Sequence, residues 1–190
     1  MNFVGKMIAA EGFTIIELMV TVSVIAIMLT IGIPSMTKFV TNIRQVSQTN
    51  DIVSDIVYAR NEAATRSRRV SMCVSQNADD ATPTCAASGT SAWATGRIIF
   101  VDMDGDGVRD ITNDANTNDI LLKKASALPS SSTLTVAGFA DTAHLTFSTF
   151  GGLTPSTAGS FKACSSLNTT GYRIAVAATG QPLSTKVNCP

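Results

Sequence analysis

Gly12-Phe13-Thr14-Ile15-Ile16-Glu17 opens an apolar run that continues to Ile33, and this stretch decides the fold. Glu17 is the one ionisable side chain between Phe13 and Ile33. At about 1.5 Å of rise per residue, a helix of this length reaches roughly 30 Å, the thickness of the hydrocarbon core of a bilayer. The run is therefore predicted to span a membrane. We expect a kink at Pro34, because proline removes one backbone hydrogen bond from a helix.

The lone carboxylate of Glu17 indicates a function, because a charge inside a membrane helix costs about 2.5–3.5 kcal/mol on insertion scales. Such a charge is tolerated when it is paired, and pairing with another subunit would couple neutralisation to assembly. An ordinary cleavable signal peptide fits less well. Its small residue follows a shorter apolar core, whereas Gly12 precedes this run.

Gly12 before Phe13, Glu17 at the fifth position counted from Phe13, and Pro34 at the end of the run resemble the N-terminus of type IV pilins and type II secretion pseudopilins. The resemblance implies that a prepilin peptidase cuts after Gly12 and methylates the new amine of Phe13. Residues 1–12 would then be a leader peptide, and residues 13–34 the transmembrane or filament-core helix. The resemblance also implies that Glu17 pairs with the N-terminal amine of a neighbouring subunit.

Beyond Pro34, apolar residues recur three and four positions apart and predict an amphipathic helix half over residues 35–68. These residues include Met36, Phe39, Ile43, Val46, Val53, Val57 and Ala64. From residue 69 to residue 190 the pattern becomes that of a β-rich domain. Strands are expected at residues 70–74, 96–101, 120–124, 133–136, 144–150, 160–164, 172–177 and 185–188. This order predicts a pilin-like α+β fold, with a long N-terminal helix packed on an antiparallel β-sheet or β-sandwich.

A second resemblance covers most of the chain. Tyr58-Ala-Arg-Asn-Glu-Ala63, Trp93 and Phe100-Val-Asp102 are similar to the GspH/FimT group of minor pilins and pseudopilins. It implies a minor pilin that enters a type IV pilus and helps to initiate or cap it, with other major and minor pilins or pseudopilins as partners. The alternatives are a type II secretion pseudopilin of the pseudopilus tip and a DNA-binding minor pilin for natural transformation. The domain would be periplasmic on an inner-membrane anchor before assembly, and would then belong to the pilus or pseudopilus.

DNA is not expected as a partner. The chain has 14 basic and 14 acidic side chains, so its net charge indicates no general affinity for phosphates. In DNA-binding members of the group, the resemblance implies a Gly-Arg-x-Arg segment near the C-terminus. The corresponding stretch here is Gly180-Gln-Pro-Leu183, with Lys186 as its only nearby cation.

The four cysteines are Cys73, Cys85, Cys164 and Cys189, an even number in a part of the chain that the anchor would export. Three pairings are open. Cys73–Cys85 and Cys164–Cys189 are favoured because each closes a short local loop. A zinc site is the rival interpretation, but the C-x-x-C spacing is missing and the sole histidine is distant in sequence.

Asp102, Asp104, Asp106 and Asp110 form a pattern similar to the start of a calcium loop, with carboxylates at alternating positions and a glycine between them. The twelfth position is Asn113, where an EF-hand has a glutamate. The alternative is an Asp/Gly turn with solvated carboxylates. No other cofactor is expected, and the protein is not expected to be an enzyme. The single histidine, His144, lies in an apolar alternation, and the sequence has no phosphate loop or G-x-S-x-G elbow.

Overall fold

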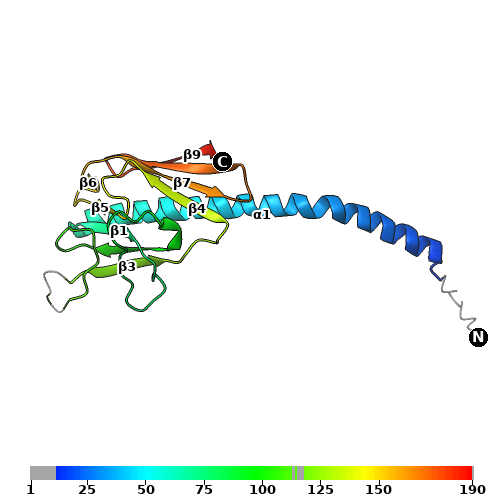
Figure 1. The fold of residues 1–190 in the computed structure, drawn as a ribbon, viewed down its shortest axis with the longest axis horizontal. Helices are drawn as coiled ribbons and strands as arrows, with labels where there is room; N and C mark the ends of the chain where they lie inside the picture. Colours follow the sequence, from blue (N-terminus) through cyan, green and yellow to red (C-terminus); the bar gives the residue numbers. More distant parts are fainter. Residues whose placement is uncertain (1–11, 113, 115–117, 190) are drawn as a thin grey trace, which may run out of the picture. The chain divides into compact units, whose positions relative to one another are not determined.

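The computed structural model describes residues 12–112, 114 and 118–189, without the side chains of residues 31–35 and 38. The chain divides into two compact units, Met1–Val40 and Thr41–Pro190. Helix α1, Ile15–Arg66, is a single helix of 52 residues (Figure 1). The predicted leader lies outside the described residues except for Gly12. The kink expected at Pro34 also stays a prediction, since that side chain is not among those described.

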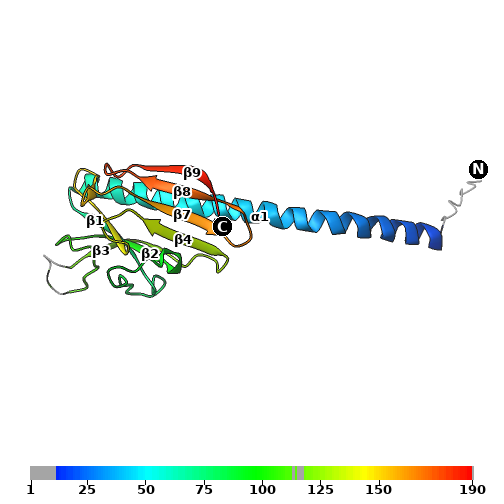
Figure 2. The ribbon, with the colours of Figure 1, turned by 45° about the horizontal axis from the view of Figure 1, so that its top comes forward.

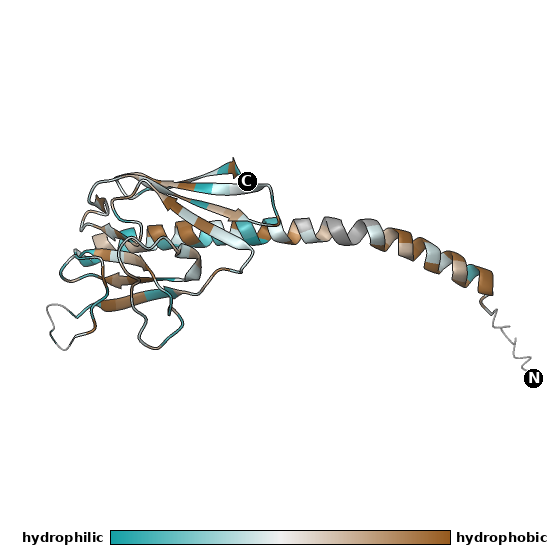
Figure 3. Cartoon of the chain, viewed as in Figure 1, coloured by the Kyte–Doolittle hydropathy of each residue, from teal (hydrophilic) through white to brown (hydrophobic). Residues whose placement is uncertain are grey.

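In the first unit, the described apolar side chains of α1 before Val40 are exposed. Phe13 is 80% exposed and Ile16 66% exposed, and brown, hydrophobic residues dominate this part of the helix in Figure 3. Among the described helices, none combines the length with the hydropathy that a membrane crossing requires.

The end of α1 follows from local backbone geometry. Ser67 adopts a left-handed conformation with φ of 50°. The N–H of Arg68 donates to the carbonyl of Ala63, and the N–H of Ser67 donates to the carbonyl of Ala64. These two bonds form a Schellman motif, which satisfies the last carbonyls of a helix. The helix therefore ends at Arg66, two residues before the expected boundary.

Two antiparallel sheets lie in the second unit (Figures 1 and 2). In spatial order, the first sheet contains β3 (Ile120–Ala125), β2 (Arg97–Val101), β1 (Val70–Val74), β5 (His144–Phe147) and β6 (Leu153–Thr154). The second contains β4 (Ser132–Ala137), β7 (Gly159–Ser165), β8 (Thr170–Val176) and β9 (Pro182–Asn188). Every expected strand range overlaps one of these strands, and the predicted α+β class is confirmed.

The core lies between α1 and the two sheets. Ile52, Ile56, Ala59 and Ala63 form the buried face of the helix, at the spacing of an amphipathic helix. The predicted apolar stripe is not this face, because the sheets cover the neighbouring side of α1: Val57 and Ala64 are exposed, and Val53 is only partly buried. Trp93, in the short 3-10 helix η1 (Trp93–Thr95), is fully buried; its ring meets that of Phe161 edge to face at 5.0 Å. The Trp93 indole N–H donates to the carbonyl of Thr142 at 2.6 Å, which satisfies its polar atom inside the core.

Strand β5 is shorter than expected because the chain turns at residue 148. The N–H of Gly151 donates to the carbonyl of Ser148, and the N–H of Ser148 donates to the carbonyl of Gly152. The hydrogen bonds that would extend the strand to residue 150 are therefore used in a turn. Strand β6 follows this turn and was not predicted, because two residues are too few to show an alternating pattern.

The structure forms the two favoured disulfides, Cys73–Cys85 and Cys164–Cys189. The second links β7 to the residue after β9, across β8. Gly171 on β8 has no room for a side chain there, because an added Cβ would meet both sulfur atoms of that disulfide. The disulfide therefore ties the end of β9 to β7, and its sulfur atoms pack directly over Gly171 on β8.

Replacing Cys189 with serine is expected to lower the free energy of unfolding by about 3 kcal/mol, because the loop between the two cysteines is no longer closed in the unfolded chain. Thermal unfolding of the full chain under oxidising conditions measures this. When both proteins are fully reduced, wild type and the variant should unfold at similar temperatures. Peptide mapping that found Cys73 joined to Cys164 would contradict the pairing.

Candidate functional site: the start of the helix and the aspartate loop

Glu17 is held by Thr14 at the start of α1. The Thr14 hydroxyl donates to Glu17 Oε2 at 2.8 Å, and the Thr14 N–H donates to the same oxygen at 2.9 Å. The Glu17 N–H in turn donates to Thr14 Oγ1 at 3.3 Å. This reciprocal arrangement is a capping box, which satisfies backbone donors at a helix start. The Thr-x-x-Glu pattern is readable in the sequence, where the lone charge of Glu17 by itself predicts only a role in assembly.

The surface around Glu17 is apolar. Phe13, Ile16 and Val20 lie three or four residues apart on the same side of the chain as Glu17, and all three are exposed. A continuous exposed apolar surface of this kind is typical of a protein or membrane contact. Both Thr14 donors use Oε2, so Oε1 is the Glu17 oxygen left for a further partner.

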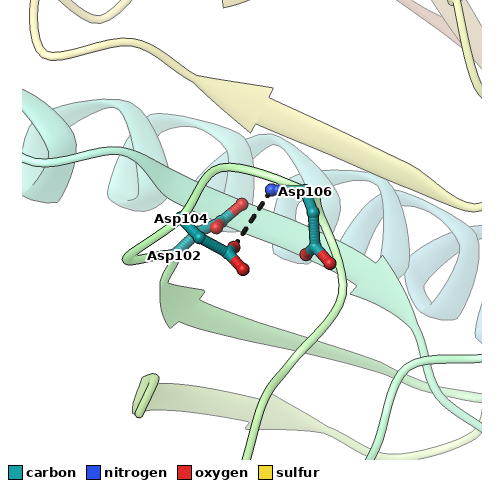
Figure 4. A group of neighbouring side chains, drawn as sticks. All are labelled: Asp102, Asp104 and Asp106. Atoms are coloured by element: carbon teal, nitrogen blue, oxygen red, sulfur yellow. Dashed lines mark hydrogen bonds between the residues drawn. The ribbon is translucent and has the colours of Figure 1, made fainter. Parts of the chain in front are cut away.

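The aspartate loop follows β2. One carboxylate oxygen from each of Asp102, Asp104 and Asp106 lies within 4.8 Å of the others (Figure 4). Asp102 is buried and accepts hydrogen bonds from Ser71 Oγ at 2.6 Å and from the N–H groups of Gly105 at 2.6 Å and Gly107 at 3.0 Å. Burial raises the pKa of Asp102 above its usual value, while these hydrogen bonds act in the opposite direction.

The four predicted calcium ligands do not all come together. Asp110 is outside the group of three, among the described residues. Asp119, which sequence reasoning missed, accepts the N–H groups of Met103 at 2.9 Å and Asp110 at 2.8 Å, and its burial raises its pKa. Asp102 and Asp119 thus bind the backbone amides of the loop itself, as aspartates in turns do. Asn113 lies outside the described residues, and calcium binding stays a prediction.

A buried ion pair joins α1 to the first sheet. Arg97 Nε on β2 donates to Asp55 Oδ2 at 2.6 Å, and Lys123 Nζ on β3 lies 2.6 Å from Asp55 Oδ1. Asp55 is 1% and Arg97 3% exposed, whereas the Lys123 side chain is 42% exposed. No local sequence pattern indicates this contact, because Arg97 and Lys123 both lie 42 or more residues from Asp55 in the chain. Its role is to fix the helix against the sheet.

His144 is placed on β5, as expected of a strand residue. Its Nδ1 lies 3.9 Å from Asp141 Oδ1. The Asp141 carboxylate accepts hydrogen bonds from the hydroxyl of Ser88 and the N–H groups of Gly89 and Ala143. The aspartate therefore organises the surrounding loops.

The chain is similar to known proteins in its sequence and in its fold. A family model described as type II transport protein GspH matches residues 48–180. The crystal structure of the type IV minor pilin FimU of Pseudomonas aeruginosa is similar at 21% identity and a TM-score of 0.50, over 80% of this chain and 92% of that one. The minor pseudopilin EpsH from the Type 2 Secretion System of Vibrio cholerae is 11% identical with a TM-score of 0.45, over 76% of this chain and 97% of that one. No curated protein sequence matches the chain. The likeness to FimU shows the fold.

Proposed function

The chain belongs to the GspH family of type II transport proteins, and from this premise we propose that it is a minor pilin of a type IV pilus. It is incorporated into the filament and helps to initiate or cap it. The observation that carries the proposal is the start of α1, where Glu17 stands among exposed apolar side chains. A subunit that has to bury this surface against neighbours is suited to a filament and not to a free monomer.

Before assembly, residues 13–34 hold the protein in the inner membrane and the β-rich domain lies in the periplasm. The prepilin peptidase removes residues 1–12 and methylates the amine of Phe13. Glu17 then pairs with the N-terminal amine of an adjacent pilin as the subunit enters the filament. The low dielectric of the filament interior strengthens this attraction.

The second candidate is a pseudopilin of the type II secretion pseudopilus. The description of the matching family favours it directly, since that family is named for type II transport. Recovery of the protein in sheared pili supports the first candidate. Loss of secretion without loss of pili, in a strain that lacks the protein, supports the second.

Leader removal is the first test of either candidate. Mass spectrometry of the assembled protein should give a chain that begins at Phe13 and carries one methyl group. Replacing Gly12 with leucine should leave the precursor uncut, because the peptidase reads the small residue before the apolar run. Replacing Gly5 with leucine changes a glycine inside the leader and should leave cleavage intact. An intact leader in otherwise functional filaments would refute the assignment.

A further inference from the structure

Two positive charges stand opposite each other on the sheet of β4, β7, β8 and β9. The antiparallel register pairs Lys162 on β7 with Arg173 on β8. The next pair along, Phe161 and Ile174, is fully buried in the core. Because side chains of a strand alternate between its two faces, Lys162 and Arg173 point to the outer face. Like charges directly opposite each other destabilise an antiparallel pair.

No acidic side chain of these four strands offsets the two charges. The register extends the row to Thr135 on β4 and Thr185 on β9. By the same alternation, two further rows share the face, and we call all twelve residues the basic face. The added rows are Ala137, Ser160, Ala175 and Leu183, and Thr133, Cys164, Gly171 and Val187. Across these four strands, all of them described, there is no aspartate or glutamate.

The basic face is open, and acidic groups are gathered elsewhere in the chain. Arg173, Thr135 and Thr185 are exposed, and Lys162 is half-buried. Residues 102–119 contain six aspartates and a single basic residue, Arg109. The zero net charge of the chain thus conceals an uneven distribution, in which residues 102–119 are acidic and the outer face of this sheet carries only positive charge. The repulsion between Lys162 and Arg173 is not compensated within these strands, and an anionic partner that covered the basic face would compensate it.

We propose that the basic face docks a cluster of carboxylates on a neighbouring filament subunit. The inference rests on the proposed function, since a filament supplies the neighbour. Lys162 and Arg173 pair with the carboxylates, and the hydroxyl of Thr185 donates a hydrogen bond from the same row. The partner surface is an acidic loop of the kind that Asp104, Asp106 and Asp110 of this chain provide. Contact between unlike surfaces of successive subunits is heterologous, and heterologous contacts that do not close into a ring build helical filaments.

Replacing Lys162 with glutamate separates docking from folding. The like-charged pair becomes an oppositely charged one, so the melting temperature of the purified full-length protein should rise by roughly 1–3 °C. The same change places a carboxylate before the acidic partner, so recovery in sheared filaments should fall about tenfold. The matched control is Lys186→Glu. Lys186 pairs with Tyr172, off the basic face, and its replacement changes the net charge equally.

Each of the following outcomes would contradict the proposed docking of the basic face. If wild type and Lys162→Glu enter filaments equally, docking is wrong while the proposed function stands. If wild type itself never enters filaments, the proposed function fails and docking fails with it. A lower melting temperature for Lys162→Glu, or equal loss of incorporation for Lys186→Glu, contradicts the charge argument. Retention of a short duplex DNA by wild type but not by Lys162→Glu, with normal incorporation, would assign the basic face to nucleic acid instead.

Discussion

Replacing Asp55 with alanine is expected to lower the free energy of unfolding by about 3–5 kcal/mol, the largest loss we expect from a single substitution in the domain. Asp55 and Arg97 are both almost fully buried, and Arg97 Nε donates to Asp55 Oδ2 at 2.6 Å. Removing the carboxylate leaves the Arg97 guanidinium inside the protein without its counter-charge. The loss reflects that stranded charge more than the strength of the pair itself.

Chemical denaturation of the full chain, followed by circular dichroism, measures the effect of Asp55→Ala. Asp51→Ala is the matched control, because Asp51 is exposed one turn earlier on α1 and its loss should change stability by less than about 0.5 kcal/mol. Lys123→Ala should cost at most about 1 kcal/mol, since the Lys123 side chain is 42% exposed and water screens its charge. An Asp55→Ala protein as stable as the Asp51→Ala control would show that the buried pair does not hold the helix to the sheet.

The double replacement Asp55→Leu with Arg97→Met distinguishes a need for charge from a need for volume. Buried ion pairs are often replaced by apolar residues of similar size without loss, because neither charge then has to be desolvated. The double variant should therefore be more stable than Asp55→Ala. Its stability relative to wild type reports how well the charged pair offsets its own desolvation.

Local patterns predicted most of the fold, since they need only neighbouring residues. The helical period of α1 and the alternation of β7 are visible in neighbouring residues. Which side of the helix is buried was predicted wrongly, since the stripe through Val57 is exposed and Ile56 lies in the core instead. The pairing of Asp55 with Arg97 depends on register between elements far apart in the chain, and no local pattern specifies it. The same holds for Lys162 opposite Arg173, which only the strand pairing shows.

In the candidate sites too, some features are visible in the local sequence and others depend on the folded chain. Glu17 was identifiable because a lone charge in an apolar run is unusual, and its contact with Thr14 lies within one helical turn. The aspartate loop was identifiable by its alternating carboxylates, but Asp119 joins it from the other end of a long connection. Which oxygens bind backbone amides is decided by the folded loop, so the sequence alone left the calcium and turn interpretations open.

Replacing Glu17 with glutamine is expected to lower incorporation into filaments about tenfold or more. Two unit charges about 4 Å apart attract by about 4 kcal/mol at an effective dielectric constant near 20, and about 1.4 kcal/mol corresponds to a factor of ten. Glutamine also serves in a capping box and can accept the hydrogen bonds that Thr14 now gives to Glu17 Oε2. The helix start should therefore be kept while the attraction for a neighbour's amine is lost.

The measurement compares wild type and Glu17→Gln in sheared filaments at equal expression, with leader removal checked by mass spectrometry. Cleavage should be complete in both, because the peptidase reads Gly12. The melting temperature should be unchanged, because Glu17 is exposed and contributes nothing to the buried core. Ser23→Ala is the matched control within the same helix: it removes a polar side chain, bonded to the carbonyl of Met19, without changing charge. Equal incorporation of Glu17→Gln and wild type under these conditions would mean that the carboxylate caps its helix and takes no part in assembly.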